Sequence, residues 1–160
     1  MYSLMIIRFL TLIWIELPTN KYADISEIKE LSPLDDFTVL LLNIRSCRKN
    51  FLEFSTLFCT YFSRFSCIAL VETWLSDGYD DLFLISGFKS VNVYRNNYGG
   101  GIRLFCRFDL NIKVLSEFTF VSNLLEMLTV ELSFAGKNIV LCVTYHVPSA
   151  DHVDNYSFIE

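Results

Sequence analysis

The chain has 160 residues, of which 52 % are hydrophobic and 19 % charged, with a formal net charge of −5 and a pI of about 5.0. This composition is too apolar for an intrinsically disordered chain, and the length gives room for one domain with a sizeable core. The acidic balance argues against a protein that binds nucleic acid by neutralising many phosphates. It does not exclude a metal-dependent nuclease, because such an enzyme gathers acidic residues around its metal.

The N-terminal stretch Met1–Leu17 is apolar, but Arg8 interrupts it and Glu16 closes it. It is short for a membrane span, and no small-residue cleavage site of a signal peptide follows it. Three interpretations stay open: an apolar extension unrelated to the domain, a signal or membrane anchor, and a strand or helix packed on the core. We assign residues 1–20 to an apolar extension, and membrane contact of residues 1–17 stays an open alternative.

Residues 21–36 are predicted to form a short helix and a linker. Asp24–Glu27 has the pattern of a capping box, and the apolar residues that follow share one helical face. Pro33 ends this helix, because proline cannot continue the backbone hydrogen-bond ladder. The main domain is therefore expected to begin at Phe37 and to cover residues 37–160.

Two apolar runs, Phe37–Asn43 and Cys67–Val71, have the length of strands that are buried on both faces. Between them, large apolar residues recur at steps of three and four, as on the buried face of a helix. These residues are Phe51, Phe54, Leu57, Phe58 and Tyr61. The order strand, helix, strand predicts a crossover helix with two parallel strands, and the aromatic stripe is expected to be core packing.

The rest of the chain reads as strands: Gly87–Tyr94, Ile102–Phe108, Ile112–Phe118, Glu126–Phe134 and Asn138–Tyr145. The run Gly99–Gly101 is expected to be a turn, because no Lys-Ser/Thr and no helix follow it. Residues 135–138 predict a hairpin turn. Ile139–Val143 is expected to be buried on both sides. The predicted fold class is α/β, with a sheet of about six strands and one main crossover helix.

Five cysteines are scattered along the chain without a Cys-x-x-Cys pair: Cys47, Cys59, Cys67, Cys106 and Cys142. An odd number without framework spacing favours free thiols in a reducing compartment. The last three lie in strand-like runs, where a buried thiol behaves as a small hydrophobic group. An intracellular location is therefore expected, with the N-terminal signal or anchor as the alternative.

Polar groups close the buried runs. Asn43 ends the first, Glu72 follows the second, and Tyr145 closes the last. Ligands and chemistry gather at the carboxyl ends of strands in open α/β sheets. Carboxylate and amide oxygens suit a hard divalent cation such as Mg²⁺.

Four segments in chain order carry a family resemblance: Leu42-Asn43-Ile44-Arg45-Ser46, Val71-Glu72-Thr73-Trp74-Leu75, Gly99-Gly100-Gly101 and Val143-Thr144-Tyr145-His146-Val147-Pro148. Together they resemble the endonuclease/exonuclease/phosphatase superfamily, in particular the apurinic-type endonuclease domain of non-LTR retrotransposons. The resemblance implies a partial four-layer α/β sandwich of the DNase-like type. It also implies DNA as the partner, nucleus or cytoplasm as the location, and Mg²⁺ or Mn²⁺ as the only cofactor.

The resemblance also assigns roles to single residues. Glu72 and Asn43 would be ligands of the metal, and Tyr145 would lie beside the scissile phosphate. The retroelement pattern carries Arg-Pro-Pro after this tyrosine, where the present chain has His146-Val147-Pro148. His146 and His152 do not match the catalytic histidine of the family and are expected to be loop residues without a catalytic role.

The family's later Asp-x-Asn and Ser-Asp-His segments have no counterpart in these 160 residues. The expectation is therefore a truncated endonuclease domain that binds metal weakly and is inactive, with an exposed sheet edge that favours self-association. Two alternatives stay open. One is a non-enzymatic interaction module, and the other is a phosphatase of the same superfamily.

Overall fold

The computed structural model describes residues 4–9, 37–79, 81–95 and 99–147. The described residues form nine strands and one α-helix. The strands are β1 (Leu4–Phe9), β2 (Phe37–Asn43), β3 (Cys67–Val71), β4 (Phe88–Val93), β5 (Ile102–Arg107), β6 (Asn111–Val114), β7 (Phe120–Val121), β8 (Leu125–Phe134) and β9 (Lys137–His146). The helix is α2 (Cys47–Phe58), and 3₁₀ turns span Phe62–Arg64 and Ser116–Phe118.

The first sheet has five strands in the order β1-β2-β3-β5-β4. β2 and β3 are parallel, and all other pairs in this sheet are antiparallel. β1 pairs with β2 along its whole length, from Leu4 opposite Leu42 to Phe9 opposite Phe37. The packed-strand interpretation is therefore the one that the structure shows for Leu4–Phe9. The strand covers an edge of β2 whose backbone groups would otherwise be unpaired.

The predicted crossover unit is confirmed, with α2 between the parallel strands β2 and β3. Phe51, Phe54 and Phe58 are buried, as the periodic pattern indicates. Leu57 is 52 % exposed, so its assignment to the buried stripe was wrong. Phe51, Phe54 and Phe58 occupy the helix face that is turned to the sheet. Leu57 lies beside this face and therefore reaches solvent. Tyr61 follows the helix and packs at the border of this cluster.

The second sheet has four strands, in which β8 pairs with β6, β7 and β9. β8 and β9 form a long antiparallel hairpin from Phe134 opposite Lys137 to Leu125 opposite His146. The turn residues Ala135 and Gly136 have φ values of 48° and 75°. Two successive positive φ values match the twist of a tight hairpin, which confirms the predicted turn.

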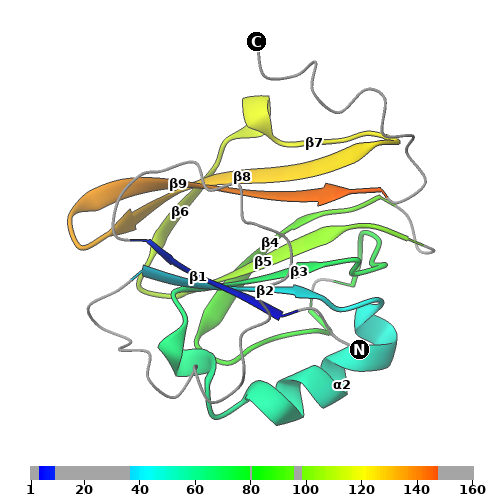
Figure 1. Ribbon diagram of the computed structural model, residues 1–160, viewed down its shortest axis with the longest axis horizontal. Coiled ribbons are helices and arrows are strands. Elements are labelled where there is room, and N and C mark those ends of the chain that lie inside the picture. Colours follow the sequence, from blue (N-terminus) through cyan, green and yellow to red (C-terminus); the bar gives the residue numbers. More distant parts are fainter. Residues whose placement is uncertain (1–3, 10–36, 80, 96–98, 148–160) are drawn as a thin grey trace.

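Figure 1 shows three layers: α2, the first sheet and the second sheet. Side chains of β3 alternate between the two spaces that these layers enclose. Ile68 and Leu70 belong to the aromatic core between α2 and the first sheet, whereas Cys67, Ala69 and Val71 belong to the core between the sheets. β3 is therefore buried on both faces, as its continuous apolar sequence predicts.

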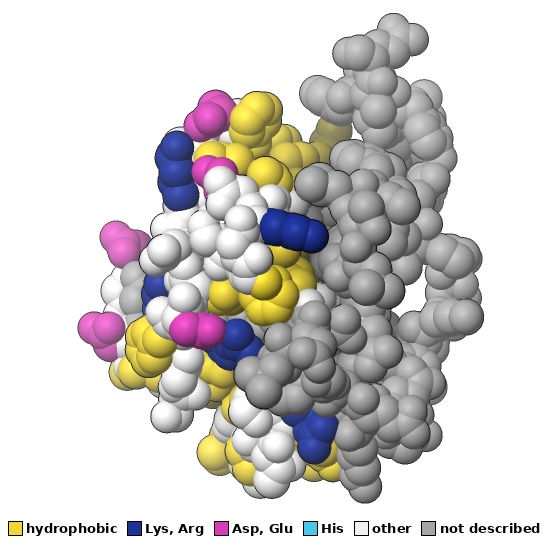
Figure 2. Space-filling view, turned by 90° about the vertical axis from the view of Figure 1, so that its left-hand side faces the viewer, with side chains coloured by type: hydrophobic (Ala, Val, Ile, Leu, Met, Phe, Trp, Pro, Cys, Tyr) yellow, Lys and Arg dark blue, Asp and Glu magenta, His cyan; other side chains and the backbone are white. Residues whose placement is uncertain are grey.

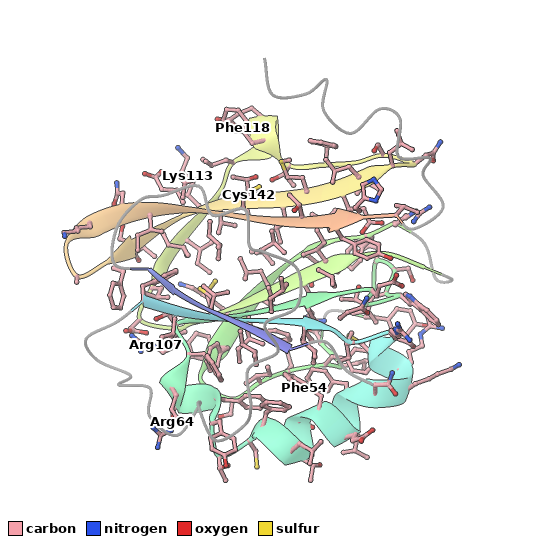
Figure 3. All side chains as sticks on the ribbon, viewed as in Figure 1. Phe54, Arg64, Arg107, Lys113, Phe118 and Cys142 are labelled. Carbon is pink, nitrogen blue, oxygen red and sulfur yellow. The ribbon has the colours of Figure 1, made fainter. Side chains whose placement is uncertain are left out.

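The fold is mixed α/β, but it has two sheets and more strands than the six expected. The strand predicted over Ile112–Phe118 is shorter, since its second part forms a 3₁₀ turn at Ser116–Phe118. β9 differs too, because Leu141 and Val143 are buried while Val140 and Cys142 are exposed. In Figure 3, Cys142 lies on the outer side of the second sheet together with Lys113 and Phe118. β9 therefore has one buried face and one solvent-exposed face.

Figure 2 faces the end of the molecule that lies at the left of Figure 1, and it shows described acidic and basic side chains scattered among apolar ones. Positive charge forms no continuous stripe on the described part of this face. Within the described residues, no helix has the length and apolar character needed to cross a membrane. The short helix and linker predicted over residues 21–36 lie outside the described residues.

Candidate functional site at the carboxyl edge of the first sheet

The three residues chosen from the sequence lie at the ends of strands that point the same way. In Figure 1 the arrowheads of β2, β3 and β9 are on one side of the molecule. Asn43 is opposite Val71 in the parallel register, so it lies beside the last residue before Glu72. Tyr145 comes from β9 in the second sheet. The site is therefore built across the two sheets.

Glu72 is held by two aromatic donors. The indole Nε1 of Trp74 donates to Glu72 Oε2 at 2.5 Å, and the phenol of Tyr145 donates to Oε1. The backbone φ is 59° at Glu72 and 53° at Trp74. Residues other than glycine rarely adopt this left-handed region. This local strain turns the chain sharply out of β3 and places the carboxylate between the indole and the phenol.

The backbone of this bend is anchored on both sides. The amide of Ser46, after β2, donates to Glu72 O at 2.8 Å. On the other side, Trp74 N donates to Gly100 O at 2.9 Å, and Thr73 N donates to Gly101 O at 3.2 Å. These bonds fix the residues around Glu72 against the glycine turn that precedes β5, so the carboxylate has a defined position.

Glu126, in β8 of the second sheet, completes the cluster. Its side chain is fully buried, its Oε2 accepts a hydrogen bond from Gly101 N at 2.7 Å, and its Oε1 lies 3.7 Å from Arg95 Nε. Burial raises the pKa of this carboxyl, and the charge of Glu72 raises it further. The Gly101 amide and the Arg95 guanidinium act in the opposite direction, yet the net effect keeps the pKa above its ordinary value.

Sequence reasoning missed Glu126, although the pattern of β8 contains a signal for it. Leu128, Val130 and Leu132 alternate along the strand and are all buried between the sheets. Glu126 has the same parity as these residues, which predicts an inward-facing carboxylate. A buried charged group is rarely tolerated unless it is paired, so its position alone marks a site with a particular role.

The glycines of the turn are required by this arrangement. Gly100 and Gly101 have φ values of 67° and 87°. A Cβ at Gly100 would overlap the Glu126 carboxylate, and a Cβ at Gly101 would lie 2.5 Å from Thr73 Oγ1. The prediction that these are turn glycines agrees with this geometry, because no side chain fits between the two sheets at this point.

Replacing Glu126 by glutamine is expected to stabilise the fold at neutral pH and to have a smaller effect in acid. A raised folded-state pKa means that the folded protein binds the proton more tightly than the unfolded chain. Stability from this group is therefore complete below the ordinary pKa of glutamate and is lost as the pH rises through the folded-state value. Glutamine does not titrate and still provides an oxygen for the Gly101 amide.

Urea unfolding of wild type and Glu126→Gln at several pH values measures this difference. Glu126→Ala is the companion variant, because it leaves the Gly101 amide without its acceptor and should cost about 1–3 kcal/mol across the pH range. A Glu126→Gln variant that loses more stability at neutral pH than in acid would contradict the expectation.

The remaining predicted residues have less central places. Asn43 Oδ1 accepts a hydrogen bond from Arg45 N at 3.2 Å. This oxygen is therefore already used within the turn that follows β2. His146 is exposed and is the last residue of β9, so the prediction that it lies in a loop was wrong. His152 lies outside the described residues.

The oxygen donors at this edge match Mg²⁺ or Mn²⁺ in kind, because hard cations take carboxylate and amide oxygens. In number they provide only part of a coordination shell. No group of three or more His, Cys, Asp or Glu side chains with metal-site geometry occurs among the described residues. Any cation held by Glu72 and Asn43 would therefore need water or phosphate oxygens as its other ligands.

Comparison with known proteins gives no family assignment. No protein-family model matches the chain, and no curated protein matches it.

Proposed function

We propose that this edge is the metal-binding part of a phosphodiesterase site of the endonuclease/exonuclease/phosphatase type, with DNA as its substrate class. The proposal extends the two-sheet fold to the DNase-like four-layer sandwich. The observation that carries it is the contact between Glu72 and Tyr145, which joins the ends of two distant strands. These two residues, 73 positions apart, are the ones to which the motif resemblance assigns the metal and the phosphate.

The chain's own residues then have separable tasks. Glu72 and Asn43 would hold the cation, which supplies positive charge to phosphoryl oxygens when bound. The Tyr145 phenol, now donating to Glu72, could donate instead to a phosphoryl oxygen once the carboxylate turns to the cation. Trp74 and the anchored backbone keep the carboxylate aimed at the edge of the sheet.

Metal binding by these 160 residues is expected to be weak. Both Glu72 oxygens and the Asn43 oxygen already accept hydrogen bonds from the protein. A cation must displace at least some of these donors and must also shed water, which Mg²⁺ does reluctantly. We further propose that the chain on its own does not cleave DNA, since the Asp-x-Asn and Ser-Asp-His segments that the family resemblance calls for have no counterpart in these 160 residues.

Titration with Mn²⁺, followed by calorimetry or by the water-proton relaxation rate, is expected to give a dissociation constant on the order of 1 mM for the wild type. Glu72→Gln should weaken binding at least about tenfold, because it removes the only carboxylate ligand. Glu117→Gln is the matched control, since this glutamate lies in the exposed 3₁₀ turn Ser116–Phe118. Equal affinities for wild type and Glu72→Gln would refute the metal assignment.

Nicking of supercoiled plasmid by the purified chain with Mg²⁺ tests the second half of the proposal. The expected result is no nicking above that of the Glu72→Gln variant. Nicking that disappears in the variant would show a competent enzyme and overturn the inactive assignment. Release of phosphate from a phosphomonoester, lost in the same variant, would favour the phosphatase alternative over the endonuclease.

A non-enzymatic interaction module is the second candidate, favoured by the outer face of the second sheet. Large apolar side chains are exposed there, with Phe118 57 % and Val140 53 % accessible, and Phe118 projects outward in Figure 3. A face of this kind favours association. Sedimentation in EDTA distinguishes the candidates, because a stable oligomer without metal is expected only of the interaction module.

A further inference from the structure

Two cysteines of the core lie directly across from each other in neighbouring strands. Cys67 in β3 is paired with Cys106 in β5, and their Sγ atoms are 3.3 Å apart. Both side chains are fully buried in the core between the two sheets. The remaining three cysteines have other surroundings, since Cys47 lies in the core between α2 and the first sheet and Cys59 and Cys142 are exposed.

The backbone pairing at this position suits a covalent bond. The amide of Arg107 donates to Ser66 O at 3.1 Å, so these neighbours form a hydrogen-bonded pair. Pairs alternate along an antiparallel ladder, which makes Cys67 and Cys106 a non-hydrogen-bonded pair with Cα atoms about 4.5 Å apart. That spacing lies within the range of about 4.4–6.8 Å found for disulfides.

We propose that Cys67 and Cys106 form a cross-strand disulfide when the chain folds in the presence of a low-molecular-weight disulfide such as oxidised glutathione. One cysteine thiolate attacks the oxidant and releases one molecule of thiol, which leaves a mixed disulfide on the protein. The second thiolate attacks the protein sulfur of that mixed disulfide and releases the second molecule of thiol. Two cysteine thiols are oxidised, one glutathione disulfide is reduced, and the two protons go to the released thiolates.

The surroundings of the pair decide when this exchange occurs. Burial raises the pKa of Cys67 well above its ordinary value, so the folded protein holds the unreactive thiol. Glutathione cannot reach side chains that are fully covered by two sheets. The bond is therefore made before the second sheet covers the pair or when β3 and β5 separate, and afterwards the same burial protects it from reduction.

The bond would connect the two strands that frame the candidate site. β3 leads directly into Glu72, and β5 follows the turn at Gly100 and Gly101. The inference does not depend on the proposed function, because it concerns the opposite ends of these strands. In a reducing compartment the pair stays as two thiols in weak contact.

The test uses the full chain with both exposed cysteines replaced, Cys59→Ser/Cys142→Ser, so that external thiols do not compete. The protein is unfolded, refolded in a mixture of reduced and oxidised glutathione, alkylated in denaturant and digested with trypsin. The expected product is Phe65–Lys89 linked to Leu104–Arg107, with Ser46–Arg48 carrying an alkylated Cys47. Cys47 is an internal reference, because it is buried and its pKa is raised to about 12 but no other cysteine faces it.

A control variant and a thermal unfolding measurement complete the test. Cys67→Ala in the same background should leave Cys106 fully alkylated. The linked form should unfold about 5–10 °C higher than the reduced form, because the bond closes a long loop in the unfolded chain. Full alkylation of Cys67 and Cys106 after refolding, a link to Cys47, or a linked form with a lower Tm would each overturn the proposal.

Discussion

Replacing Phe54 by alanine is expected to lower the free energy of unfolding by about 3–5 kcal/mol. Phe54 lies between α2 and the first sheet in Figure 3 and is 3 % exposed. Its ring is 5.4 Å from the rings of both Phe58 and Phe62, and 5.9 Å from that of Phe51. The variant would lose these contacts and leave a cavity that three other aromatic rings cannot fill without moving.

Leu52→Ala is the matched control, since this leucine is in the same helix and is 79 % exposed. We expect it to change stability by less than about 0.5 kcal/mol, because little apolar area is lost and alanine favours the helix. Urea unfolding followed by circular dichroism measures both values. Similar losses for the two variants would mean that the helix presents a different face to the sheet.

Gly100→Ala is expected to cost about 3–5 kcal/mol, from a backbone penalty and a steric overlap together. The added methyl group would meet the Glu126 carboxylate and would lie 2.7 Å from Arg95 Cδ. Gly100 also provides the carbonyl that anchors Trp74, so the bend around Glu72 should move with it. Mn²⁺ affinity is therefore expected to fall together with stability.

Gly136→Ala separates the two contributions. Its φ of 75° is close to the 67° of Gly100, but nothing lies within 4 Å of a Cβ at this hairpin turn. Only the backbone penalty of about 1–2 kcal/mol should remain, with no change in Mn²⁺ affinity. Equal losses at Gly100 and Gly136 would show that the turn before β5 has room for a side chain and that Glu126 does not press on it.

The sequence by itself determined the elements whose pattern depends on local spacing. The apolar runs at Phe37–Asn43 and Cys67–Val71 predicted two buried strands, because a strand covered on both faces needs no polar residue. The aromatic period between them predicted α2, and the turn sequence at residues 135–138 predicted the hairpin that joins β8 and β9. The same rules placed Glu72 and Tyr145 at strand ends, since each is the polar residue that closes an apolar run.

Only the tertiary structure decided which faces of these strands are buried and which are exposed to solvent. Val140 and Cys142 read as core residues in an apolar run, but the outer side of β9 is exposed. Periodicity cannot tell how many layers cover a strand, because an apolar residue is tolerated on either face. Leu4–Phe9 likewise became part of the sheet through pairing with β2, which depends on an edge that the sequence does not show.

The candidate site divides in the same way. The sequence supplied Glu72 and Tyr145, but their hydrogen bond exists because β9 of the second sheet lies over the end of β3. The role of Glu126 was found only in the structure, since it depends on Gly101 and Arg95, which lie in the connection between β4 and β5. Contacts between residues far apart in the chain are fixed by the packing of the two sheets, and no local pattern encodes the register of that packing.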